Sequence, residues 1–106
     1  MANPHAGEVA LWLDGRRHVL KLTLGALAEL EASLGEDSLV ALVERFEGGR
    51  YSARDVLALI VAGLRGGGWR GSAEDLRTAE VRGGPVEAAR VAAQLLARAF
   101  AMPGEL

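Results

Sequence analysis

The sequence predicts a mostly helical α+β fold, in which an N-terminal β-hairpin packs on a bundle of about five helices. One observation is the hydrophobic period, which changes near Thr23 from about two residues to about 3.6 residues. Another is a series of glycine pairs that interrupt the later sequence at helical lengths. The chain has 106 residues, 50% hydrophobic and 25% charged, so we expect one globular domain over 1–106.

The hairpin is expected to consist of strands at 8–13 and 17–23, joined by an Asp-Gly turn. Asp-Gly supplies the positive φ angles that a two-residue hairpin turn requires. Alternate residues of the first strand are apolar, with Leu11 and Leu13 on one face and Trp12 on the other. Because a lone hairpin is marginal in water, its apolar face should pack against helices.

Each expected helix has a start or stop signal. Ser52 can cap the third helix with Asp55 as its capping-box partner, and Pro85 occupies the preferred first position of the last helix. The third helix is apolar nearly all round, which is typical of a helix in the middle of a core. The expected helices cover 24–34, 38–47, 53–65, 73–81 and 85–102.

Charge and composition exclude several classes of function. The formal net charge of -2 lacks the basic footprint of a nucleic-acid-binding protein. The absence of cysteine excludes disulfides, thiolate chemistry and cysteine-based zinc sites. The longest apolar run, 56–64, is far shorter than the roughly 20 residues that span a bilayer. Residues 1–7 lack the features of a signal peptide, so we expect a cytoplasmic protein without membrane contact.

The motifs that would indicate catalysis or ligand binding lack the surrounding elements or partner residues that such sites require. The glycine pattern at 66–71 follows a helix rather than a strand, so it indicates a connector and not a dinucleotide site. A helix-turn-helix at 38–65 would need polar side chains on its second helix, where an apolar wall separates Arg54 and Asp55 from Arg65. His5 and His18 lack a convergent second group. We therefore expect no enzyme, cofactor or metal site.

Two tryptophans are candidates for protein contacts. Trp69 lies in a loop beside Arg70, and aromatic residues with arginine are common anchors at interfaces. Alternatively, Trp69 folds back and closes the edge of the core. Trp12, on the mixed face of the hairpin, has the same two interpretations. Trp69 and Arg70 are therefore candidate binding residues.

The last helix has a narrow polar stripe between two apolar flanks, so it has more apolar surface than a core face needs. The stripe consists of Glu87, Arg90, Gln94 and Arg98. The flank expected on the core consists of Val86, Ala89, Ala93, Leu96 and Phe100. The flank expected to bind a second copy or a hydrophobic partner segment consists of Ala88, Val91, Leu95, Ala99 and Met102. The alternative is that residues 73–81 or the hairpin cover this second flank.

Several short stretches carry a family resemblance: GEVAL at 7–11, LDG at 13–15, LTLGALAELE at 22–31, YSARDV at 51–56 and AGLR at 62–65. Together they resemble a small family from the tail gene cluster of gene transfer agents and related tailed phages and prophages. Members of that family are described as gene transfer agent family proteins, phage tail tube proteins or tail assembly chaperones. The resemblance is clearest over residues 7–67.

The resemblance implies a role in building a phage-like tail. A tail assembly chaperone binds the tape measure protein in the bacterial cytoplasm, keeps it soluble and helps recruit tail tube subunits around it. The alternative is a structural tail (tube) subunit that becomes part of the particle. A tube ring needs an extensive β-sheet, which one hairpin cannot supply, so we expect the chaperone role. A small enzyme is the third and least favoured class.

Overall fold

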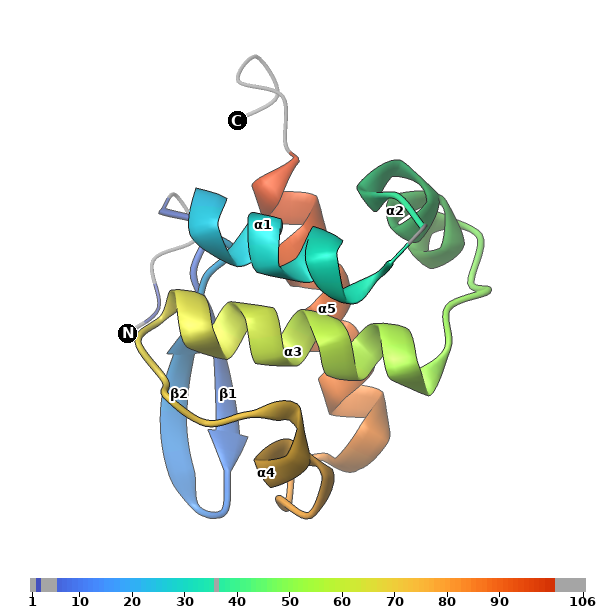
Figure 1. Ribbon diagram of the computed structural model, residues 1–106. Helices are drawn as coiled ribbons and strands as arrows, with labels where there is room; N and C mark the ends of the chain where they lie inside the picture. Colours follow the sequence, from blue (N-terminus) through green and yellow to red (C-terminus); the bar gives the residue numbers. More distant parts are fainter. Residues whose placement is uncertain (1, 3–5, 36, 101–106) are drawn as a thin grey trace.

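The structure, a computed structural model, describes residues 2, 6–35 and 37–100; within them a two-stranded antiparallel hairpin precedes five helices (Figure 1). This confirms the predicted mostly helical α+β fold. The strands are β1 (Val9–Leu13) and β2 (Arg16–Leu20). The helices are α1 (Leu24–Ser33), α2 (Leu39–Glu47), α3 (Ala53–Gly66), α4 (Ala73–Arg77) and α5 (Gly84–Ala99).

The hairpin turns at the predicted Asp-Gly pair, where Asp14 and Gly15 have φ angles of 49° and 80°. In the register, Leu11 lies opposite His18, and the apolar face of β1 is buried. The second strand ends earlier than predicted, at Leu20, because the chain then pairs with a helix. The backbone N–H of Lys21 donates to the carbonyl oxygen of Gly63 in α3 at 2.9 Å.

Side-chain caps begin the first three helices. The hydroxyl of Thr23 accepts the N–H of Ala26 at 3.1 Å, and Ser38 caps α2 in the same way. At α3 the predicted capping box is confirmed. The Ser52 hydroxyl accepts the N–H of Asp55 at 3.1 Å, and the Asp55 carboxylate accepts the N–H of Ser52 at 2.9 Å.

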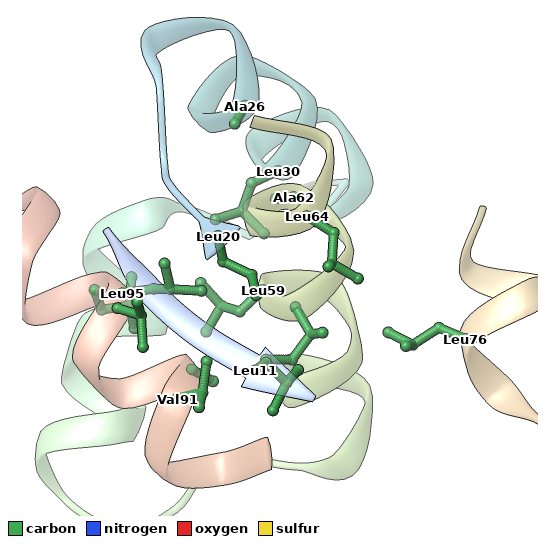
Figure 2. Packing of buried hydrophobic residues seen from close by; sticks show 14 of the residues in the cluster. Leu11, Leu20, Ala26, Leu30, Leu59, Ala62, Leu64, Leu76, Val91 and Leu95 are labelled. Carbon is green, nitrogen blue, oxygen red and sulfur yellow. The ribbon is translucent and has the colours of Figure 1, made fainter. Parts of the chain in front are cut away.

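The third helix lies in the middle of the molecule, as predicted, with contacts to α1, α4, α5 and β2 (Figure 1). Figure 2 shows Leu11 and Leu20 of the hairpin gathered with Leu59 of α3 and Leu95 of α5. Gly63 allows this close approach, since a Cβ there would lie 2.7 Å from Cδ1 of Leu95. Within the described residues, no helix has the length and apolar character needed to cross a bilayer.

The fourth helix is shorter than predicted, ending at Arg77 instead of continuing to Val81. Val81 forms a β-bridge with Leu13. Next to it, the N–H of Asp14 donates to the carbonyl oxygen of Glu80, and the Asp14 carboxylate accepts the N–H of Glu80, both at 2.9 Å. Pairing with the edge of β1 satisfies backbone groups that a longer helix would have used internally.

The prediction for the two flanks of α5 is wrong in orientation. Val91 and Leu95, expected on the open flank, are 0% and 1% exposed. Val86 and Phe100, expected on the core, are 81% and 44% exposed, and only Leu96 of that flank is fully buried. The physical reason is that α5 turns toward β1 and the space beside Gly63, which receives Leu95. The hairpin thus covers the flank, as the alternative interpretation held, together with α3, which that interpretation did not include.

Candidate protein-binding surfaces

An apolar groove lies between the start of α3, α4 and the first turns of α5. Its volume is about 610 Å³, and most of its lining is aliphatic. The lining that defines it includes Val56, Ile60, Leu76, Val81, Val86 and Ala88. Figure 2 shows Leu76 extending from α4 toward the main cluster. Leu76 is also among the residues that line the groove. A groove of this size and composition suits an apolar side chain or segment of a partner.

Two glycines lie where α5 begins: Gly83 is its N-cap and Gly84 is its first residue. Gly83 and Gly84 have φ angles of 90° and 71°, which glycine adopts without strain. They turn the chain sharply from the bridge at Val81 into α5, with Pro85 in the first helical turn. Val86 therefore lies at the very start of the helix, beyond the reach of the core, and its side chain is left largely exposed.

An ion-pair network attaches the start of α3, where Ser52 and Ala53 line the groove, to α2. Arg45 donates to both carboxylate oxygens of Asp55 at 2.9 Å and to Asp37 at 2.6 Å. Burial alone would raise the pKa of Asp55, but the hydrogen bonds from Arg45 and Ser52 outweigh it and lower that pKa below its ordinary value. The start of α3, which lines the groove, is therefore firmly attached to α2.

A second pocket lies where β2 meets the loop after α3. Its volume is about 460 Å³. We call it the arginine pocket and define it by Arg17, His18, Trp69 and Arg70, which line it together with Val19, Leu64 and two glycines. Trp69 packs partly against the core and is half-buried, in agreement with the alternative that it folds back on the edge of the core, and its role as a binding residue stays a prediction. Both arginines are exposed.

Trp12 has a different environment from Trp69. The guanidinium carbon of Arg82 lies 4.1 Å from the centroid of the Trp12 ring, a cation–π contact. Its cross-strand neighbour is Arg17 of the arginine pocket. Among residues 2, 6–35 and 37–100, no three histidine, aspartate or glutamate side chains lie close enough to hold a metal ion.

The candidate binding residues of the last helix are thus distributed over different places. Ala88 lines the apolar groove, and Ala99 lines a small hollow beside Lys21. Val91 and Leu95 lie in the core, so this conformation cannot present them to a partner. Met102 and His5 lie outside the described residues.

Sequence reasoning missed Val86 as an exposed residue, although one signal could have indicated it. A residue in the first turn after a Gly-Gly-Pro start lies at the end of its helix, where fewer neighbouring elements can cover it.

A family model matches residues 6–102, nearly the whole chain. The description of that family is phage tail tube protein, GTA-gp10. The match confirms the resemblance to gene transfer agent and phage tail proteins and extends it through the last helix. Neither the curated proteins nor the solved structures gave a match.

Proposed function

The chain belongs to the GTA-gp10 family of phage tail tube proteins, and from this premise we propose that it acts as a tail assembly chaperone. In this role it binds the tape measure protein in the cytoplasm of the bacterial host and helps recruit tail tube subunits. It works by binding proteins and not by catalysis. It releases its partners as the tail of the gene transfer agent, phage or prophage is completed.

The observation that carries this proposal is the apolar groove. Aliphatic side chains of three helices line a volume of about 610 Å³, and Val86 stands 81% exposed at its rim. Exposed apolar surface of this kind is a common site of protein contact, because moving a partner's apolar side chains out of water lowers the free energy. An apolar segment of a long tape measure protein would be kept from aggregating while it occupies such a groove.

The description of the family favours a second function, that of a structural tube subunit. Against it, the described residues hold one hairpin and a single added bridge at Val81, with little sheet to line a ring. Purified particles discriminate between the two functions. Mass spectrometry should find many copies of a structural subunit, whereas a chaperone should be absent.

The direct test is co-purification of this chain with the tape measure product of the same gene cluster. Val86→Glu should abolish it by placing a charge at the rim of the groove. Val40→Glu is the matched control, because Val40 is 69% exposed on α2 and does not line the groove. Equal retention by both variants would contradict the groove as the binding site. Normal tails after deletion of the gene would contradict both functions.

A further inference from the structure

The loop after α3 holds the Trp69 ring in a defined place. The backbone N–H of Trp69 donates to the carbonyl oxygen of Leu64 at 2.9 Å. The ring lies directly on the backbone of Gly71, where any side chain would overlap it. Arg65 ties this part of the loop down by donating to the Gly71 carbonyl at 3.2 Å and to Glu29 at 2.7 Å. The ring is therefore positioned before a partner arrives, which lowers the entropy cost of binding.

The two arginines of the pocket have no carboxylate partner within the part of the chain that the structure describes. Arg45, Arg65, Arg77 and Arg90 each form an ion pair with an aspartate or glutamate. Arg17 and Arg70 form none with a described residue, which they share with other arginines such as Arg16 and Arg50, and no acidic residue among those described lines their pocket. In a chain whose net charge is -2, this pocket is a local site of positive charge.

A third cation strengthens the positive field of this side of the hairpin. Arg82 stacks on Trp12, whose cross-strand neighbour is Arg17. At the tip of the hairpin the carboxylate of Asp14 accepts the backbone N–H of Glu80 and is not among the residues that line the pocket. Like charges that share a surface repel one another, so an anion placed between them is stabilised by each of them.

We propose that the arginine pocket binds an acidic segment of a partner protein. A carboxylate of the segment pairs with Arg17 and Arg70, and a neighbouring apolar side chain lies on the Trp69 ring. Guanidinium groups form strong charge-assisted hydrogen bonds to carboxylates, and arginine and tryptophan are enriched at the centres of protein interfaces. A nucleic acid would need a broad basic face, whereas only two arginines of the described residues line this pocket.

This inference adds the chemistry of a second contact to the proposed function, but its test does not depend on that function. Two peptides serve as probes, acetyl-Gly-Leu-Asp-Glu-Leu-Gly-amide and its neutral counterpart with Asn-Gln in place of Asp-Glu. Each is titrated into the full chain labelled with ¹⁵N, and the indole N–H signal of Trp69 is followed. Trp12→Phe identifies which of the two indole signals belongs to Trp69.

The acidic peptide should shift the Trp69 signal saturably, with a Kd below about 1 mM. The neutral peptide should give no saturable shift, and added salt should weaken the binding of the acidic one. Arg17→Glu combined with Arg70→Glu should weaken it by at least about tenfold, because both charge-assisted contacts are lost. Both residues are exposed, so the doubly substituted chain should keep its thermal midpoint.

The matched control is Arg16→Glu combined with Arg50→Glu, which makes the same change of charge at two exposed arginines outside the pocket. This control should bind the acidic peptide within about twofold of the original chain. Equal binding of the two peptides, no saturable shift, or equal losses in both charge-reversed chains would overturn the inference. Tighter binding of a twelve-residue thymidine oligonucleotide than of the acidic peptide would overturn it in favour of phosphate recognition. None of these outcomes bears on the apolar groove or on tail assembly.

Discussion

Two apolar regions lie side by side on α3 and α5, yet one is packed and the other is open. In the core, Leu95 fills the space that Gly63 leaves between the helices and is 1% exposed. In the apolar groove, Val86 of the same helix is 81% exposed. The difference lies in what covers each region: the hairpin and α3 close over Leu95, whereas the five-residue helix α4 and Val81 only border the groove. Apolar residues of one helix are thus buried in the core or left exposed, depending on which elements lie beside them.

The largest effect is expected from Leu95→Glu. A carboxylate at this position would be buried without a partner, which costs about 4 kcal/mol or more and is enough to unfold a small domain. Far-ultraviolet circular dichroism and a thermal melt should show loss of the cooperative transition. A folded variant with an unchanged midpoint would mean that this flank is open after all.

A smaller effect is expected where backbones touch at the edge of the core. A Cβ on Gly66 would overlap the carbonyl oxygen of Lys21, which cannot move away as a flexible side chain could. Gly66→Ala should therefore lower the free energy of unfolding by about 1–3 kcal/mol, measured by urea denaturation. Gly25→Ala in α1 is the control, because the nearest atom to its Cβ would be the Thr23 hydroxyl oxygen at 3.9 Å. It should be neutral or stabilising.

The attachment of α3 to α2, at the end of the groove, can be tested through pH. Asp55→Asn should lower the free energy of unfolding at pH 7 by about 1–2 kcal/mol, since it weakens the cap and the contact with Arg45. The lowered pKa of Asp55 means that its ionised form stabilises the fold above its ordinary pKa of 3.8. That contribution is lost as the pH falls through the lower folded-state pKa.

The difference in stability between Asp55→Asn and the original chain should therefore shrink as the medium is acidified below pH 3.8. Asp75→Asn at the exposed cap of α4 is the matched control, with a smaller effect at pH 7 because Asp75 makes no ion pair with any described residue. A difference that stays constant down to the lowest pH would contradict the role given to the charge of Asp55.

The smallest effect on stability is expected from Val86→Glu. This substitution introduces glutamate into α5, as Leu95→Glu does. Its side chain enters water, so the free energy of unfolding should change by no more than about 0.5 kcal/mol in urea denaturation. A loss comparable to that of Leu95→Glu would show that the groove is closed in solution and would remove the contrast between the two regions.

The features that the sequence predicted correctly are those set by local chemistry. The Asp14-Gly15 turn depends on two positive φ angles, and the capping box of Ser52 and Asp55 depends on two side chains three residues apart. The change of hydrophobic period near Thr23 likewise separates the hairpin from the helices through the spacing of nearby residues. The family resemblance also rested on such short stretches. Local geometry of this kind is determined by a few neighbouring residues, so the sequence is enough to predict it.

Tertiary structure decided which apolar surfaces are covered. The sequence by itself determined that α5 has an apolar arc wider than a core requires, but the space beside Gly63 decided that Leu95 enters the core and leaves Val86 outside. The sequence also determined that a helix starts after Ser72, but pairing of Val81 with Leu13 ended that helix early. These outcomes depend on contacts between residues far apart in the chain, because burial and backbone pairing are properties of assembled surfaces and not of any single segment.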